Sequence, residues 1–207
     1  VQGGLPAERI VVKPNFVHPD PGVGDGRGGD ALFVGRLTRE KGVLTLVEAW
    51  RWTGSLVSLK IIGDGPLAAD VSKATESIFG VEWLGRRSRQ EVLNLMQEAA
   101  FLVFPSELYE GFPVTLVEAF ATGLPIVASN LGAMSSLVDH GRTGLHFHPG
   151  DPRDLAAKVK WLVDHPAELA RMRRQAREEF EAKYTAEKNY EMLMEIYGRA
   201  IEAACRK

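Results

Sequence analysis

The sequence FLVFPSELYEGFPVTLVEAFATGLPIVAS, residues 101–129, decides the fold because it holds a strand, a helix and a second strand in that order. Residues 101–105 and 125–129 are short continuous apolar runs, which predict strands buried on both faces of a sheet. Residues 114–122 have helical spacing, with a proline before them and a Gly-Leu-Pro stop after them. Two buried strands joined by a helix run parallel, so this unit predicts a parallel sheet covered by helices.

The same alternation of apolar runs and helical stretches extends back toward the N-terminus. Further strands are predicted at residues 31–35, 59–63 and 81–85, with helices at residues 42–52, 67–77 and 89–99. We therefore predict an α/β fold with a doubly wound parallel sheet and right-handed crossovers. In such sheets ligands bind at the carboxyl ends of the strands, so the functional residues should directly follow the strands.

The two ends of the chain differ from this central part. Extra C-terminal helices are predicted at residues 152–165, 168–184 and 185–204, and the last has an apolar face wide enough to need a partner. Near the N-terminus, residues 9–13 predict a short strand. The glycine-rich residues 19–30 predict a flexible connector that packs no side chains.

Composition excludes several classes of protein. The 207 residues are 45% hydrophobic and 25% charged, and their net charge of −2 gives no sign of a nucleic-acid partner. No apolar run approaches the roughly 20 residues of a transmembrane helix. The one cysteine, Cys205, excludes an internal disulfide and fits a reducing compartment, so we expect a cytoplasmic protein. The first residue, Val1, is not an initiator methionine, and no signal peptide follows it, so we expect a piece of a longer protein.

The first candidate site is the start of the helix at residues 114–122. A helix N-terminus attracts phosphate, and carboxylates accept hydrogen bonds from sugar hydroxyls. Glu110 lies in the loop before this helix, Glu118 lies just beyond its first turn, and Gly111 would let backbone approach a ligand. A nucleotide-sugar has hydroxyls on both sides of a diphosphate, so the stretch predicts a site for one. The alternative is an ordinary helix with an acid near its positive end, which explains either glutamate alone.

A second candidate is the cation pair Arg36 and Lys41, at the carboxyl end of the strand at residues 31–35. Cations beside a helix N-terminus oppose the helix dipole, so their position is unfavourable unless an anion binds there. Arginine can fork onto two phosphate oxygens, and lysine adds a point charge. The alternative is a solvated surface pair that bonds to Glu40.

Weaker signals follow other strands. Gly63 lies in a turn that lacks the third glycine of a dinucleotide fingerprint, so a tight turn is favoured, although Gly63 could border a ligand. Gly85 ends the strand at residues 81–85, where a base could lie against backbone. His146 and His148 are two residues apart, so they would share a face if this segment were a strand, but no third ligand is near in sequence and no metal site is expected.

Together these motifs resemble those of a known family. Gly35-Arg36-Leu37 with Lys41-Gly42, the Glu110-x7-Glu118 spacing and residues 123–129 resemble the C-terminal half of a family 4 glycosyltransferase of the GT-B fold. The resemblance extends from about residue 14 to residue 184. It implies a Rossmann-like domain of a retaining enzyme that transfers a hexose from a UDP-, GDP- or ADP-sugar, without a metal ion or other cofactor.

The resemblance also implies roles for individual residues. Arg36 and Lys41 would hold the pyrophosphate, Glu118 the ribose diol, and Glu110 the transferred sugar, so Arg36, Lys41 and Glu110 are the expected catalytic residues. The expected donor-binding residues lie at strand ends and at the helix start; they are Gly35, Arg36, Lys41, Gly63, Gly85, Glu110, Gly111, Phe112, Pro113, Val114, Thr115 and Glu118.

The resemblance further implies that the acceptor site and an active-site histidine belong to the family's N-terminal domain, which has no counterpart in this sequence. By the resemblance, residues 1–30 are a remnant of the inter-domain segment and linker, and residues 31–183 are the nucleotide-sugar-binding domain. By the same resemblance, residues 184–207 are expected to form a C-terminal helix that packs on the N-terminal domain. We therefore expect the chain alone to be inactive. Peripheral membrane association of the longer protein stays open.

Three other functions remain to be weighed. A non-catalytic nucleotide-sugar binding or regulatory module would keep the same site, and a nucleotide-sugar epimerase would share the GT-B fold. A dinucleotide-dependent oxidoreductase ranks last, because it needs a three-glycine loop after the first strand, where this chain has Gly35-Arg36-Leu37.

Overall fold

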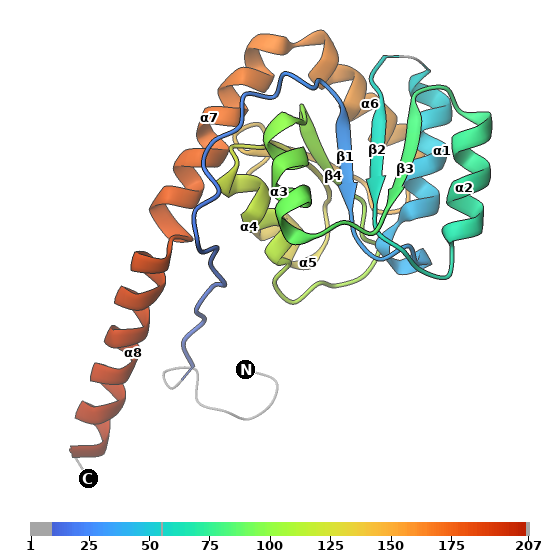
Figure 1. The fold of residues 1–207 in the computed structure, drawn as a ribbon. Coiled ribbons are helices and arrows are strands. Elements are labelled where there is room, and N and C mark those ends of the chain that lie inside the picture. The colour runs from blue at the N-terminus through green and yellow to red at the C-terminus, as the bar shows by residue number, and fades with distance from the viewer. Residues whose placement is uncertain (1–9, 55, 206–207) are drawn as a thin grey trace.

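The structure, a computed structural model, describes residues 10–54 and 56–205, and within them six parallel strands form one sheet (Figure 1). Their order across the sheet is β3-β2-β1-β4-β5-β6. The strands are β1 (Ala31–Val34), β2 (Leu59–Ile62), β3 (Val81–Gly85), β4 (Phe101–Phe104), β5 (Ile126–Ser129) and β6 (Gly144–Phe147). The order reverses between β1 and β4, which defines the switch point where doubly wound sheets bind ligands. The predicted fold class is thereby confirmed.

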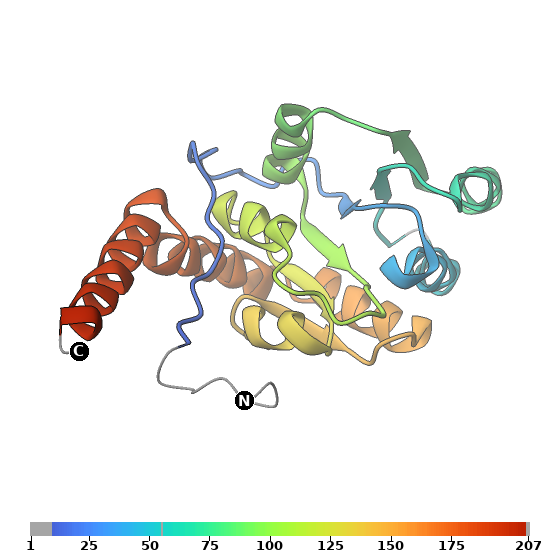
Figure 2. The same ribbon diagram turned by 90° about the horizontal axis from the view of Figure 1, so that it is seen from below.

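Helices cover both faces of this sheet (Figure 2). The helical elements of the described residues are η2 (Arg39–Lys41), α1 (Val43–Thr53), α2 (Ala68–Ser77), α3 (Arg89–Glu98), α4 (Val114–Ala121), α5 (Gly132–Leu137), α6 (Pro152–Asp164), α7 (Pro166–Lys183) and α8 (Ala186–Cys205), of which α8 lies away from the sheet. Helices α1, α2 and α6 contribute to one apolar core, and α3, α4 and α5 contribute to the other. Alternate strand residues serve the two cores: Phe33 belongs to the first and Leu32 to the second. This double burial explains why the strands are continuous apolar runs.

The elements predicted from the sequence between residues 31 and 129 are all present, with ends that differ by one residue at most. The three C-terminal helices are also present as α6, α7 and α8. The strand predicted at residues 9–13 is wrong: Arg9 lies outside the described residues, and residues 10–13 are irregular. This segment bonds to α8 instead of to a sheet, because Lys13 Nζ donates to Asn189 Oδ1 at 2.8 Å.

The expected flexible connector at residues 19–30 is also corrected, because the structure packs it against helix ends. The backbone N–H of Gly24 donates to the carbonyl of Thr122, and that of Gly28 to the carbonyl of Glu98, each at 3.0 Å. A Cβ at Gly24 would lie 2.1 Å from the carbonyl oxygen of Gln97. Glycine is therefore needed here for close approach, and the segment satisfies carbonyls that a helix C-terminus leaves free.

Helix α7 holds the same two helix ends with arginines. Arg173 Nη2 donates to the carbonyl of Ala99, beyond α3, and Arg177 Nη1 donates to that of Ala121 in α4, both at 2.6 Å. Arg177 also pairs with Asp20 at 2.6 Å, which ties the connector to α7. Cations at helix C-termini complement the helix dipole, so α3 and α4 are fixed at the ends opposite their N-termini.

Helix α8 projects away from the sheet (Figures 1 and 2). Its large apolar side chains Tyr190, Met194, Tyr197 and Ile201 are exposed, while Asn189, near its start, is buried. Tyr197 and Ile201 belong to the apolar face that the sequence predicted for this helix, and both side chains are exposed in the described structure. Among the described residues, no helix combines the length and the apolarity that a bilayer crossing requires.

Candidate functional site

A cavity of about 190 Å³ lies at the switch point, at the carboxyl ends of β1 and β4. It is lined by residues that follow these two strands and by the start of α4: Phe33, Val34, Gly35, Arg36, Lys41, Phe104, Pro105, Ser106, Glu110, Pro113 and Thr115. The structure thus brings together the three predicted catalytic residues, Arg36, Lys41 and Glu110. These residues are far apart in sequence, but they meet at one edge of the sheet because the carboxyl ends of parallel strands lie together there.

The cation and the acid of this cavity are in direct contact. Lys41 Nζ lies 2.6 Å from Glu110 Oε1, and their side chains are 31% and 17% exposed. Ser106 Oγ lies 2.7 Å from the same carboxylate oxygen and 3.2 Å from the carbonyl of Glu40. Glu110 is therefore held by a charge-assisted hydrogen bond and a hydroxyl, which fixes its position. Ser106 was not among the predicted site residues, although its position two residues after β4 was a usable signal.

A second, wider cavity of about 640 Å³ adjoins the first, since Gly35 and Arg36 line both. It lies at the carboxyl ends of β1, β2 and β3, and its lining is Val34, Gly35, Arg36, Ile62, Gly63, Asp64, Gly65, Arg86, Arg87 and Val92. Together the two cavities form one surface along the strand ends, with cations at the centre and at the β3 edge. Gly85 lies outside this lining, while its neighbours Arg86 and Arg87 belong to it.

Gly63 has a structural role that explains its identity. Its φ is 136°, and a Cβ there would lie 1.8 Å from the carbonyl oxygen of Gly35. The chain therefore needs glycine at 63 so that the ends of β1 and β2 can meet, whatever binds beside them. This agrees with the tight turn predicted for the segment.

The residues predicted around the start of α4 divide into two groups. Pro113 and Thr115 line the first cavity, while Val114 is exposed and outside its lining. Phe112 packs its ring edge-on against Tyr184, with centroids 6.2 Å apart. Gly111 is exposed, and a Cβ there would meet no atom within 4 Å, so nothing in the described structure requires glycine at this position.

Glu118 lies one turn further along α4, outside the lining of both cavities. Its side chain is 13% exposed, and its Oε1 accepts a hydrogen bond from Arg89 Nε at 2.9 Å. Arg89 was not among the predicted site residues, because no local sequence pattern pairs the first residue of one helix with the second turn of another.

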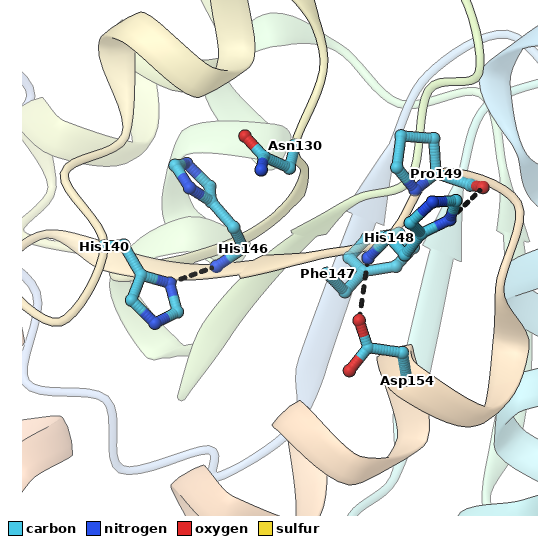
Figure 3. A pocket seen from close by; sticks show the side chains of 7 residues that line it. All are labelled: Asn130, His140, His146, Phe147, His148, Pro149 and Asp154. Carbon is cyan, nitrogen blue, oxygen red and sulfur yellow. Dashed lines mark hydrogen bonds between the residues drawn. The ribbon is translucent and has the colours of Figure 1, made fainter.

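A third cavity, of about 800 Å³, lies elsewhere, around the end of β6 (Figure 3). It is lined by Asn130, His140, His146, Phe147, His148, Pro149 and Asp154. The described residues contain no group of three or more histidine, cysteine or acidic side chains that could hold a metal ion. β6 ends at Phe147, so His148 lies beyond the strand and its ring lies apart from that of His146 (Figure 3).

His146 has an unusual environment in this cavity, in both its hydrogen bonding and its pKa. Its backbone N–H donates to His140 Nδ1 at 2.9 Å, and its own Nε2 is buried without a partner in the described structure. Burial lowers the pKa of His146, and the nearby His140 lowers it further. The arrangement favours a neutral, packed imidazole.

Comparison with known proteins places the chain in a family. It belongs to the glycosyl transferases group 1 family, whose model matches residues 25–179. This confirms the resemblance and identifies the sheet as the Rossmann-like fold of a GT-B glycosyltransferase.

Individual relatives agree with this assignment. An uncharacterized glycosyltransferase of Methanocaldococcus jannaschii is 31% identical over 191 residues, which cover 91% of this chain and 53% of the relative. The D-rhamnosyltransferase WbpZ of Pseudomonas aeruginosa is 33% identical over 159 residues, 75% of this chain and 41% of the relative. The chain thus spans about half the length of these curated relatives.

Solved structures show the same fold. The crystal structure of Anabaena Alr3699/HepE in complex with UDP superposes with a TM-score of 0.84 at 20% identity, over 96% of this chain and 60% of that one. Sucrose-phosphate synthase from Thermosynechococcus elongatus superposes with a TM-score of 0.79 at 22% identity, over 93% of this chain and 53% of that one.

Proposed function

We propose that this chain is the donor-binding half of a retaining, metal-independent glycosyltransferase that takes a hexose from a UDP-, GDP- or ADP-sugar. One observation carries the proposal: Arg36, Lys41, Glu110 and the start of α4 line a single cavity at the switch point of the sheet. The fold neighbour Alr3699/HepE was crystallised with UDP, which supports a nucleoside diphosphate as the ligand of such a fold.

The residues of the cavity fit the charge changes of glycosyl transfer. When the sugar–oxygen bond breaks, negative charge grows on the departing diphosphate. Arg36, Lys41 and the free N–H groups at the start of α4 would stabilise that charge, so the protein supplies the positive charge that a metal ion supplies in other enzymes. Glu110 would orient the transferred sugar, which lowers the entropy cost of the reaction.

The acceptor half would come from a partner domain. The curated relatives are about twice as long as the part matched here, and α8 exposes Tyr190, Met194, Tyr197 and Ile201. We propose that an N-terminal domain covers this face and brings the acceptor, so residues 1–30 and 184–207 link two domains around residues 31–183. We extend the proposal to a cytoplasmic location, since Cys205 is a free, exposed thiol.

Calorimetry with UDP, GDP and ADP tests the donor site. We expect one of the three to bind the chain, and Arg36→Ala and Lys41→Ala each to weaken that binding about tenfold or more, as for a lost charge-assisted hydrogen bond. Lys160→Ala is the matched control, because Lys160 pairs with Asp164 on the exposed side of α6. Absence of binding with all three, or unchanged binding by both variants, would overturn the proposal.

A second measurement tests the transfer itself. The chain alone is incubated with added acceptors and with the nucleotide-sugar of the nucleotide that binds. We expect no transfer of the sugar to the acceptors at a useful rate. Product analysis with the longer protein would then separate a transferase from an epimerase or a binding module: a new glycosidic bond supports the proposal, and an altered nucleotide-sugar, or no product, contradicts it.

A further inference from the structure

The ion pair between Arg89 and Glu118 joins two helices that border the candidate site. Arg89 is the first residue of α3, and Glu118 lies in the second turn of α4. The Arg89 side chain is 51% exposed and the Glu118 side chain 13%, so the guanidinium lies on the solvent side of a largely covered carboxylate.

Helix stability does not explain this arginine. A cation in the first turn of a helix opposes the helix dipole. The start of α3 is already satisfied by Ser88 and Glu91, which form a capping box. A half-exposed ion pair also contributes little to folding. The charge of Arg89 is therefore unfavourable for α3, its own helix, while its guanidinium bonds to a carboxylate of the neighbouring helix α4.

The position of the pair relates it to both cavities. The start of α3 adjoins the wider cavity through Arg87 and Val92, and the start of α4 adjoins the smaller one through Pro113 and Thr115. Across residues 10–54 and 56–205, Arg89 is the one recorded hydrogen-bond donor to the carboxylate of Glu118. A carboxylate accepts about four hydrogen bonds, so Glu118 keeps capacity for hydroxyl donors.

We propose that Arg89 is a positioning residue for the nucleotide: it orients the Glu118 carboxylate toward the ribose hydroxyls and cancels its charge beside an anionic diphosphate. The inference rests on the proposed function and names a residue that the motifs did not. Without a neighbouring cation, a largely covered carboxylate would repel the diphosphate that Arg36 and Lys41 attract. With Arg89, the same carboxylate acts as a fixed acceptor of hydrogen bonds.

The test compares nucleotides with and without the ribose 2′-hydroxyl. Calorimetry would measure UDP, GDP and ADP, and the 2′-deoxy form of whichever binds, on the 207-residue chain. We expect the wild type to bind the ribose form about five- to tenfold more tightly than the deoxy form. Arg89→Ala should reduce this ratio to about two or less, and Arg89→Lys, which keeps the charge but not the Nε–H, should give an intermediate ratio.

The controls separate positioning from folding. Arg51→Ala removes an arginine of similar exposure from the Glu48 pair on α1, away from both cavities, and should keep the wild-type ratio. Glu118→Gln should lower the ratio as Arg89→Ala does, and the double variant should lower it no further. Where Arg89→Ala does not fold, Arg89→Lys and Glu118→Gln give the same comparison.

The outcomes distinguish the two ideas. If the wild type binds none of the three diphosphates, the proposed function is wrong and this inference is wrong with it. If the wild type binds and discriminates, but Arg89→Ala and Arg89→Lys keep its full ratio, only the role of Arg89 is overturned. An equal loss of affinity for ribose and deoxyribose forms would also overturn it, because that would indicate a merely structural pair.

Discussion

Lys41 Nζ and Glu110 Oε1 lie 2.6 Å apart, which joins η2, after β1, to the loop after β4. The cation proposed for the diphosphate and the acid proposed for the sugar thus restrain each other. Ser106 bonds to the same carboxylate oxygen, so the Glu110 side of the pair is held by a second contact. The charge that the proposed donor would meet therefore depends on both partners, and changing either one should alter the action of the other.

Replacing Glu110 by glutamine should separate sugar binding from diphosphate binding. The neutral amide frees Lys41, so the nucleoside diphosphate should bind as tightly as to the wild type or more tightly. The corresponding nucleotide-sugar should lose about tenfold relative to the diphosphate, because its sugar loses a carboxylate acceptor. Calorimetry with both ligands gives the ratio, and an equal weakening of both would contradict the assigned role.

Replacing Gly63 by alanine should destabilise the fold strongly. The new Cβ would lie 1.8 Å from the carbonyl oxygen of Gly35, at a φ of 136°. We expect a loss of at least about 3 kcal/mol in the free energy of unfolding, measured by urea titration. Gly141→Ala is the matched control: its φ is 80°, but a Cβ there meets nothing within 4 Å, so about 1–2 kcal/mol of backbone strain is expected. Similar losses in both variants would refute the close-approach argument.

Replacing Arg177 by alanine should loosen the connector and the end of α4 together. Its side chain is 17% exposed and pairs with Asp20 and Glu181, while Nη1 donates to the carbonyl of Ala121. We expect a loss of about 2–4 kcal/mol in the free energy of unfolding. Arg174→Ala, on the exposed side of the same helix, should change it by about 0.5 kcal/mol or less. If Arg177→Ala and Arg174→Ala change the free energy of unfolding equally and by a small amount, the contacts of Arg177 do not stabilise the protein.

The stability of the protein should fall as pH drops below the ordinary histidine pKa of about 6.5. The pKa of His146 is lowered by burial and by His140, so between the two values the unfolded chain binds a proton that the folded chain does not. Stability then falls as pH decreases through this window. His146→Leu should reduce the loss measured by urea unfolding between pH 7.5 and pH 5.5. The same substitution at exposed His148 controls for the added apolar side chain, and an unchanged loss in His146→Leu would contradict this account.

Much of the fold could be predicted because its strands are buried on both faces. Runs such as residues 101–105 and 125–129 carry that burial in the sequence itself. β6 was missed because His146 interrupts its short apolar run, and α5 was missed because its six residues, Gly132–Leu137, are too few to show a helical period. The glycine-rich connector was misread because glycine marks both flexible chain and close backbone approach, and only the neighbouring atoms distinguish the two.

The candidate site was predictable to the extent that its residues follow strands. Arg36, Lys41 and Glu110 were found in this way, because parallel strands bring their carboxyl ends to one edge. Contacts between elements were not predictable. No pattern in the sequence shows that Ser106 bonds to Glu110, or that Arg89 reaches Glu118 from a different helix.

The packing of the glycine-rich segment affects how this protein can be dissected. A shortened chain that starts at Ala31 would keep every strand, yet it would expose the carbonyls of Thr122 and Glu98 that glycine N–H groups now satisfy. It would also leave Arg177 without Asp20. Because these losses fall on the C-terminal ends of α3 and α4, removing a segment whose sequence looks dispensable would destabilise the two helices whose opposite ends border the candidate site.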